Sequence, residues 1–264
     1  MRKYLTYFIV SFRANTAFKV DVSISIIFEM VYFYIYFSLW QTIYSVSNVS
    51  TISSYSISAM VTYYFVTAFL YQTDPTRAIY LGNEIWNGNF TNDLIKPWRV
   101  KFIHYIYTAG DVGFRLFMYL PFFFFIYLTV HNYIIIPTPL NLLFFVFTVF
   151  LTFIMMMSFY LIFHTLTFFL GDQYANIGLI AYLVTFLGGG VIPLSLLPDA
   201  VKPYIEYLPF RFAFNEPANI FLGKVTTTEV FWGWFQIILW SILFYLIYSI
   251  IFQKGTKRYT GTGR

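Results

Sequence analysis

Ionisable side chains inside long apolar stretches are the first candidates for chemistry, because a charge in apolar surroundings needs a partner or a function. Glu29 lies about two helical turns into the first apolar run, and Arg115 lies about one turn into the third. If both runs cross a membrane, the two groups lie at a similar depth and can form an intramembrane ion pair. We favour a structural ion pair; a proton relay is the alternative.

A third candidate, His164, lies near the end of the fourth apolar run. Its position is more typical of a packed or interfacial side chain than of a catalytic base. The sequence has no phosphate-binding G-x-x-x-x-G-K-[ST] loop, no H-E-x-x-H, no G-x-S-x-G and no carboxylate cluster. It has no cysteine, which excludes thiolate metal sites and cysteine nucleophiles. We therefore predict no catalytic residue, no metal site and no cofactor bound by this chain.

The composition requires a solvent other than water for most of the surface. Hydrophobic residues make up 59% of the sequence, and Asp, Glu, Lys and Arg only 10%, whereas about a quarter of a soluble domain is charged. The basic residues lie between apolar runs rather than along one solvated face, so they indicate membrane topology and not nucleic-acid binding. The sequence predicts an all-α integral membrane protein that forms a single transmembrane domain over residues 1–264.

Six apolar runs are long enough to cross a bilayer. We predict transmembrane helices at residues 22–44, 55–73, 112–130, 140–170, 174–194 and 230–252. The fourth run is longer than a hydrocarbon core of about 30 Å requires, so it must tilt, kink or project beyond it. The fifth run loses its helical character where glycine and proline break the helix. The breaking residues are Gly188, Gly189, Gly190 and Pro193.

The distribution of lysine and arginine predicts the orientation of these helices. Thirteen basic residues lie on the side that holds both termini and the 76–111 loop. Only Lys202, Arg211 and Lys224 lie on the other side. Because basic residues are retained on the cytoplasmic side, we predict a multi-pass protein of the cell membrane with both termini in the cytoplasm. Residues 76–111 then form an inner loop, and residues 195–229 lie outside.

Residues 1–20 precede the first uninterrupted apolar run and have their own pattern. Leu5, Phe8, Ile9 and Phe12 recur at helical spacing, with Arg2 and Arg13 off that stripe. The pattern predicts an amphipathic helix that lies on the cytoplasmic interface. An irregular segment that leads into the first span is the alternative.

The inner loop contains a short helix signal. A turn at Asn87-Gly88 precedes a segment that Thr91 can cap and that Pro97 ends. Phe90, Leu94 and Ile95 then lie on one side of a helix too small to form a core. We interpret this face as a docking surface for the groove of a partner protein. A surface loop that rests on lipid is the alternative.

The outer segment 195–229 is also patterned. Val201, Tyr204, Ile205 and Leu208 follow helical spacing between two prolines, and residues 217–222 form a second short helix that ends at Gly223. The two helices can dip back into the outer leaflet if the joints between them are covered by the spans. We therefore expect this region to roof a pathway; a plain extracellular loop is the alternative.

Three segments together resemble a known family. Residues 85–97 are similar to the pattern I-x-x-G-x-[LF]-x-x-x-L-[LI]-x-P, residues 190–223 are similar to a re-entrant region, and residues 255–259 are similar to G-x-[KR]-R-Y. Their order and spacing resemble the permease subunits of type 2 ABC exporters, in particular a bacterial branch of about this length. The resemblance covers essentially the whole chain. Asp93 stands where the family often has a less charged residue.

The resemblance implies an architecture and a set of partners. It implies an N-terminal elbow helix, six spans, a coupling helix in the inner loop and extracellular re-entrant helices before the last span. Two permeases, identical or sister subunits, would pair with two ATPase subunits that bind ATP and Mg²⁺. The coupling helix would fit a cleft of the ATPase. Its residues would be Asn89, Phe90, Thr91, Asp93, Leu94, Ile95 and Lys96, and an outer gate would comprise Gly188, Gly189, Gly190, Pro193 and Pro209.

These expectations define a function and its alternatives. We expect a non-catalytic permease that moves an amphipathic or lipid-like substrate out of the cytoplasm, with energy from the ATPase. A membrane-embedded lipid-modifying enzyme would need paired His, Asp or Glu at one depth, and Glu29 with His164 is a poor set for that chemistry. An ion-coupled carrier would show inverted repeats and charged groups near the middle of the membrane, and neither is visible in the sequence.

Overall fold

The computed structural model describes residues 2–77, 80–95, 100–170 and 174–260. The regular structure of these residues is helical, apart from one isolated β-bridge between Ile52 and Tyr55. The helices are α1 (Arg2–Ala14), α2 (Lys19–Ser47), α3 (Ile57–Thr73), α4 (Tyr80–Trp86), α5 (Phe90–Leu94), α6 (Val100–Val130), α7 (Pro139–Leu170), α8 (Tyr174–Leu187), α9 (Lys202–Glu206), α10 (Asn215–Phe221) and α11 (Thr227–Arg258).

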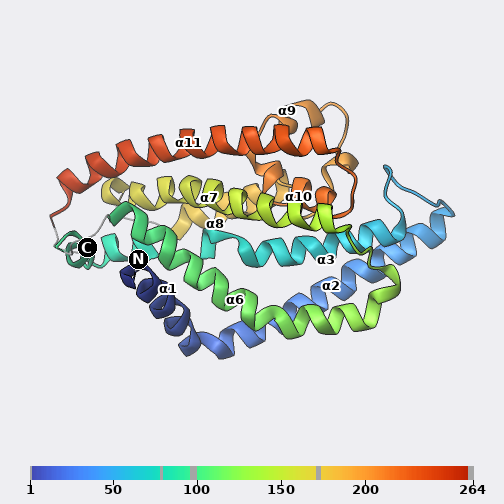
Figure 1. The fold of residues 1–264 in the computed structure, drawn as a ribbon, viewed down its shortest axis with the longest axis horizontal. Coiled ribbons are helices and arrows are strands. Elements are labelled where there is room, and N and C mark those ends of the chain that lie inside the picture. The colour runs from blue at the N-terminus through green and yellow to red at the C-terminus, as the bar shows by residue number, and fades with distance from the viewer. Residues whose placement is uncertain (1, 78–79, 96–99, 171–173, 261–264) are drawn as a thin grey trace.

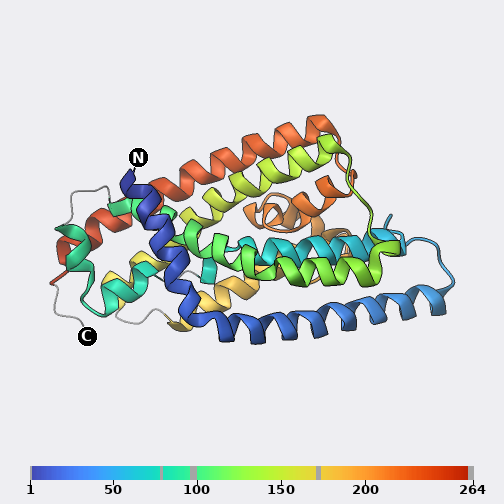
Figure 2. The same ribbon diagram turned by 60° about the horizontal axis from the view of Figure 1, so that its bottom comes forward.

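The long helices lie side by side and give the molecule two distinct ends (Figure 1). We call one the termini end, because α1 begins there and α11 finishes there, beside α4 and α5. The connection between α2 and α3 lies at the opposite end. Helices α7 and α11 pack along their length, and α1 crosses α6 at an angle to α2 (Figure 2). The bend between α1 and α2 is the short 3-10 turn at residues 15–18.

Four helical segments of the described chain are long and apolar enough to cross a membrane. They are Tyr4–Ser47, Val100–Tyr133, Pro139–Leu170 and Thr227–Arg258. Helix α3 has 17 residues and α8 has 14, so they are about 25 and 21 Å long, shorter than a hydrocarbon core of about 30 Å. Helices therefore lie at all six predicted positions, and the number of complete crossings stays a prediction.

Helices α2, α6 and α11 are longer than the sequence predicts, and α2 extends by three residues at each end. Helix α6 begins at Val100 instead of residue 112, so the 76–111 segment is mostly helical. The first turns of α6 were not predicted as part of the span because they contain polar side chains. Two of these, His104 and Thr108, lie on the buried face of the helix. Helix α11 continues to Arg258, beyond residue 252. Its last turn holds exposed Lys257 and Arg258, whose positive charge is favourable at a helix C-terminus.

Helix α1 packs closely on α6. A Cβ atom at Gly110 would lie 2.6 Å from the carbonyl oxygen of Phe8, so only glycine permits this approach. At the same crossing, the Ser11 hydroxyl donates to the carbonyl oxygen of Tyr107 at 2.6 Å. The predicted stripe is divided: Phe12 packs on α6, whereas Leu5 is 60% exposed. Phe8 and Phe12 both lie beside Gly113 of α6, and buried Ser11, which is off the predicted stripe, lies at the crossing as well.

Helix α2 exposes most of its apolar surface. Only 6% of the most apolar window of the Tyr4–Ser47 segment is buried. Ile27, Phe28 and Val31 are each more than half exposed. A soluble protein rarely carries so continuous an apolar face, so this surface suits lipid or another membrane protein.

Candidate functional site

A tight reversal joins α4 to α5 at the termini end. Gly88 has a φ of 78°, which glycine adopts without strain, and its N–H donates to the carbonyl of Ile85 at 3.3 Å. Helix α5 begins at Phe90, with Asn89 in the N-cap position. The Thr91 hydroxyl donates back to the carbonyl of Gly88 at 3.3 Å, so Thr91 stabilises the turn and is not the predicted cap. The Asn87-Gly88 turn itself is present.

Phe90 fixes α5 to the ends of two long helices. It is fully buried and packs edge-on against three rings from α7, α11 and the residue that follows α11. The ring centroids lie 5.4 Å from Phe168, 5.9 Å from Phe252 and 5.4 Å from Tyr259. Such edge-to-face pairs each contribute about 0.5–1.5 kcal/mol beyond the burial of their area. We call these four residues the aromatic clamp.

Helix α4 joins the same apolar cluster. Leu81 and Ile85 are buried with the clamp, together with Met157 and Leu161 of α7. Both short helices are therefore held by one continuous core rather than lying free on the surface. A displacement of α4 and α5 must move the adjoining ends of α7 and α11 as well, because close-packed groups transmit displacement.

The C-terminal motif at residues 255–259 supplies part of this clamp. The ring of Phe168 lies directly against the backbone of Gly255, in the space a Cβ atom would take. Tyr259 packs edge-on against Phe168, with ring centroids 5.8 Å apart. The Arg258 guanidinium lies over the Phe169 ring at 5.4 Å. The motif and the α4–α5 segment are thus in contact. This contact was not predicted from the sequence. The aromatic residues present in both segments were the one feature that could have indicated it.

The outward face of this segment is smaller than predicted. Ile95 is 77% exposed and Leu94 is 44% exposed. Phe90, by contrast, points into the clamp, so the prediction that it shares their exposed face is wrong. Asp93 is also buried, and Lys96 lies outside the described residues. Phe90 is buried because aromatic rings of α7 and α11 pack against it, and the sequence of the loop alone does not show that these rings lie there.

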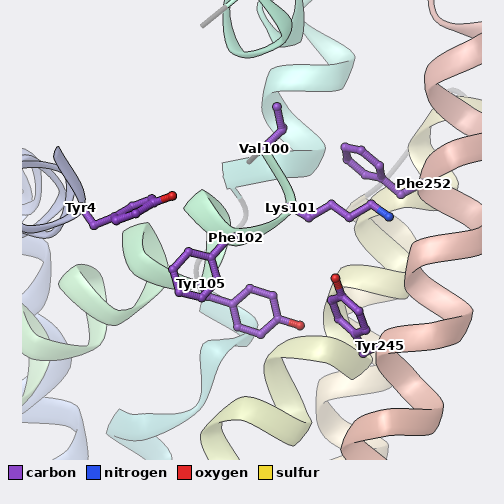
Figure 3. A pocket seen from close by; sticks show the side chains of 7 residues that line it. All are labelled: Tyr4, Val100, Lys101, Phe102, Tyr105, Tyr245 and Phe252. Carbon is purple, nitrogen blue, oxygen red and sulfur yellow. The ribbon is translucent and has the colours of Figure 1, made fainter. Parts of the chain in front are cut away.

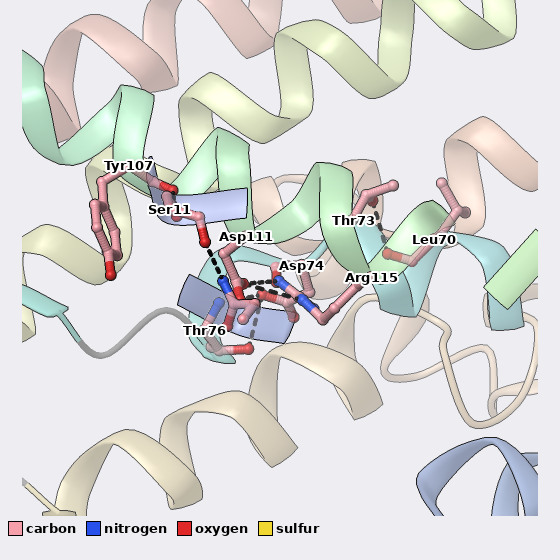
Figure 4. Close-up of polar contacts among 9 residues, drawn as sticks. Ser11, Leu70, Thr73, Asp74, Thr76, Tyr107, Asp111 and Arg115 are labelled. Carbon is pink, nitrogen blue, oxygen red and sulfur yellow. Dashed lines mark hydrogen bonds and ion pairs between the residues drawn. The ribbon is translucent and has the colours of Figure 1, made fainter. Parts of the chain in front are cut away.

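Arg115 is buried in a polar cluster beside the end of α3 (Figure 4). Its Nε donates to Asp111 Oδ2 at 3.1 Å, and a terminal nitrogen lies 2.9 Å from the same oxygen. The guanidinium also donates to the carbonyl of Asp74 at 2.9 Å. The structure thus pairs Arg115 with Asp111 in place of the predicted Glu29. The early start of α6 is the reason, because it puts Asp111 one helical turn before Arg115.

Asp74 connects this cluster to α7 and to the chain that leads into α4. Its Oδ1 accepts from both the backbone N–H and the hydroxyl of Thr76, each at 2.8 Å. Tyr160 of α7 donates to Asp74 Oδ2 at 3.5 Å. The start of the α4–α5 segment is therefore anchored to α6 and α7 through polar contacts, while its other end is held by the aromatic clamp.

Glu29 lies elsewhere, on the wall of a cavity of about 500 Å³ between α2, α3 and α8. Tyr36 of α2 and Tyr64 of α3 stack on each other in the wall of this cavity, with ring centroids 4.7 Å apart. The lining side chains are mainly aromatic or hydroxylated. They include Ser25, Phe28, Tyr32, Phe33, Thr67, Tyr71, Tyr182 and Thr185. The cavity reaches Gly190 and Val191, where α8 has ended.

The glycines at 188–190 end α8 in a compact cap. Gly190 N–H donates to the carbonyl of Thr185 at 2.7 Å, and Gly189 N–H donates to that of Phe186 at 3.2 Å. Gly189 has a φ of +85°, so the pair of bonds forms a Schellman motif. At Gly188 a Cβ atom would lie 2.7 Å from the carbonyl oxygen of Phe210. The predicted helix break is therefore present.

Neighbouring helices hold this break in place. The Tyr63 hydroxyl of α3 donates to the carbonyl of Gly189 at 2.6 Å. The N–H of Asn215, at the start of α10, donates to the carbonyl of Gly188 at 2.9 Å. Pro193 precedes a 3-10 turn, and buried Pro209 begins another. All five predicted gate residues thus lie between the end of α8 and the start of α10, and Gly190 lines the cavity. Their gating role stays a prediction.

The remaining titratable candidate is a packed side chain. His164 is buried within the bundle on α7, as the interpretation of a packed histidine predicts. Among the residues that the structure describes, no group of three His, Asp or Glu side chains is placed to hold a metal ion.

Comparison with known families gives one result that covers most of the chain. A family model described as "ABC-2 family transporter protein" matches residues 30–263. The matched region includes the α4–α5 segment, the glycine break and the C-terminal motif. No curated protein and no solved structure matches the chain.

Proposed function

Because this chain belongs to the ABC-2 family of transporter proteins, we propose that it is the permease subunit of an ABC exporter whose energy comes from a separate ATPase subunit. The family is a membrane component of transport, and the sequence carries no recognisable nucleotide-binding loop. ATP and Mg²⁺ are then bound by the partner. In the proposed assembly, two permeases stand beside two ATPases, and the protein itself catalyses no reaction.

The attachment of α5 is the observation that carries this proposal. Phe90 is locked into the aromatic clamp, while Ile95 projects from the other side of the same short segment. A partner that binds Leu94 and Ile95 would therefore pull directly on the ends of α7 and α11. Helix α7 has 32 residues, or about 48 Å, so its movement extends across the whole membrane.

The polar cluster of Arg115, Asp111 and Asp74 is a second contact through which movement of this segment would reach the long helices. It ties the chain before α4 to Arg115 of α6 and to Tyr160 of α7. When an ATPase dimer closes, Asp74 would move with α6 and α7, and Phe90 would move with α7 and α11. Both described ends of the segment are thus attached to long helices.

The cavity between α2, α3 and α8 is the proposed route for substrate. Its volume of about 500 Å³ lies within the range of pockets that hold small molecules. Tyrosine rings offer apolar faces with hydroxyl groups at their tips, and Glu29 adds one ionisable group. This lining favours an amphipathic or lipid-like substrate. The glycine cap and the turns at Pro193 and Pro209 would open at the outer end.

Helix α2 suggests where the second permease binds. Its exposed apolar face borders the same cavity through Phe28 and Tyr32. A sister or identical subunit placed there would close the open side of the route and cover that face. In this arrangement the termini end faces the cytoplasm, and substrate leaves the cell membrane on the outer side.

The test separates coupling from folding. Leu94→Ala and Ile95→Ala together should weaken co-purification of the permease with its ATPase and lower ATP-driven export by about thirtyfold, since interface hot spots contribute about 2 kcal/mol or more. The matched control is Ile136→Ala, because Ile136 is 73% exposed in the connection between α6 and α7. Unchanged export and co-purification in the double variant would refute the docking role.

A further inference from the structure

A second cavity lies between α1, α6 and α11 at the termini end, apart from the proposed substrate route (Figure 3). Its volume is about 600 Å³. Tyr4 of α1 stands on one side, Tyr245 and Phe252 of α11 stand on the other, and the first turns of α6 lie between them (Figure 3). The residues of α6 that line it are Val100, Lys101, Phe102 and Tyr105.

Lys101 is the one charged side chain among the seven residues that line this cavity. Its ammonium donates to the Ser249 hydroxyl and lies 5.5 Å from the centre of the Phe252 ring. Both partners are neutral, and among the described residues no carboxylate forms a salt bridge with it. Lys101 is half-buried. A cation with aromatic walls and no acidic partner favours an anionic ligand, because taking a charge even partly out of water is unfavourable unless it is paired.

The mouth of the cavity faces the apolar exterior. Phe102 is 51% exposed and Tyr245 is 44% exposed. Along α11 the neighbouring side chains Leu246 and Ile250 are each more than half exposed. In a membrane protein such a surface contacts acyl chains, so a ligand enters this cavity from the lipid rather than from water.

We propose that this cavity binds an anionic phospholipid of the membrane, with the lipid phosphate on Lys101 and an acyl chain between Phe102 and Tyr245. Two observations favour a lipid over a free phosphate. The volume is far larger than a phosphate ion needs, and every wall except Lys101 is aromatic or aliphatic. The bound lipid would fill the gap between α1 and α11 and brace the elbow helix beside the aromatic clamp.

The experiment uses the full-length permease in detergent with phosphatidylglycerol as the probe and phosphatidylcholine as the neutral comparison. Native mass spectrometry measures retained lipid for the natural chain, Lys101→Met, Lys101→Arg and Lys19→Met. Lys19 is an exposed lysine at the start of α2, so its replacement removes the same charge outside the cavity. Unfolding temperatures show whether each variant is folded.

We expect Lys101→Met to retain phosphatidylglycerol about fivefold less well, since one basic residue near anionic lipid contributes about 1 kcal/mol. Lys101→Arg and Lys19→Met should retain it normally, and phosphatidylcholine should respond little to any variant. Equal loss in Lys19→Met would overturn the proposal, because the effect would then reflect net charge. Displacement of the lipid by millimolar inorganic phosphate would overturn it in favour of a soluble anion.

Discussion

The ring of Phe168 rests on the backbone of Gly255, and this contact brings α7 and α11 together at the point where α5 is attached. No side chain larger than a hydrogen fits between them. Phe168 in turn supports Phe90, whose ring centroid is 5.4 Å away. The glycine of the C-terminal motif is therefore required by the packing of the α4–α5 segment.

Gly255→Ala should destabilise the protein, because the added Cβ forces the Phe168 ring away from its partners. Overpacking of this kind costs about 1–3 kcal/mol, so the unfolding temperature in detergent should fall. Gly178→Ala is the matched control, since a Cβ at Gly178 meets nothing within 4 Å. There the same change should leave stability equal or slightly higher, as alanine favours helix over glycine. Equal effects at both positions would contradict the proposed packing.

Phe90 and Tyr259 should be energetically coupled. Their rings meet at 81° with centroids 5.4 Å apart, a geometry that contributes about 0.5–1.5 kcal/mol in double-mutant cycles. Phe90→Ala alone should cost about 3–5 kcal/mol. Unfolding measurements on Phe90→Ala, Tyr259→Ala and the double variant give the coupling. The cycle of Phe90→Ala with distant Ile136→Ala should be additive, and an additive Phe90–Tyr259 cycle would contradict the clamp.

Arg115→Met should be strongly destabilising. The change leaves Asp111 without its partner in a site where the Arg115 side chain is only 6% exposed, and breaking a buried pair costs about 3–5 kcal/mol. Adding Asp111→Leu should restore most of that loss, because the unpaired charge is then gone. Lys202→Met, which breaks an exposed pair with Asp199, should change the unfolding temperature little. A small effect of Arg115→Met would show that the buried pair contributes little.

Stability should fall as pH rises because of Glu216, which lies in α10 between the spans. Burial raises the pKa of its carboxyl, and Arg211 offsets only part of that shift. The protonated form is thus favoured in the folded state, so Glu216 opposes folding increasingly above about pH 4.3, where a free glutamate ionises.

Glu216→Gln should remove this loss and flatten the dependence of the unfolding temperature on pH. Asp199 provides a contrast of opposite sign, because Lys202 lowers the pKa of its exposed carboxyl. Its small contribution is present at neutral pH and is lost as pH falls. If Glu216→Gln and Asp199→Asn gave the same pH profile, burial of Glu216 would not be the cause.

Much of the architecture could be predicted from local signals. Glycine and proline marked the end of α8, and Asn87-Gly88 marked the turn before α5, since both depend on backbone geometry that few residues adopt. The six apolar runs correctly located helices at the six predicted spans, which are α2, α3, α6, α7, α8 and α11. Hydropathy failed at the start of α6, where buried His104 and Thr108 made a helix look like a loop.

The partners of the candidate residues could not be predicted in the same way. Arg115 pairs within its own helix rather than with Glu29, and Phe90 turns inward. The inward position of Phe90 depends on contacts between segments far apart in the sequence, such as Phe90 with Tyr259. The Arg115–Asp111 pair is local, and it was missed because the predicted span began only at residue 112. A single sequence reports the spacing within a segment but not which distant side chain fills the space beside it.

Cross-linking tests the central claim, that the Leu94–Ile95 surface docks on an ATPase, most directly. The chain has no cysteine, so Ile95→Cys and Ile136→Cys each provide one attachment point for a photoreactive maleimide in the assembled transporter. The account predicts an adduct with the ATPase from position 95 and none from position 136. Labelled protein at position 95 without an ATPase adduct, or an adduct from position 136, would contradict it.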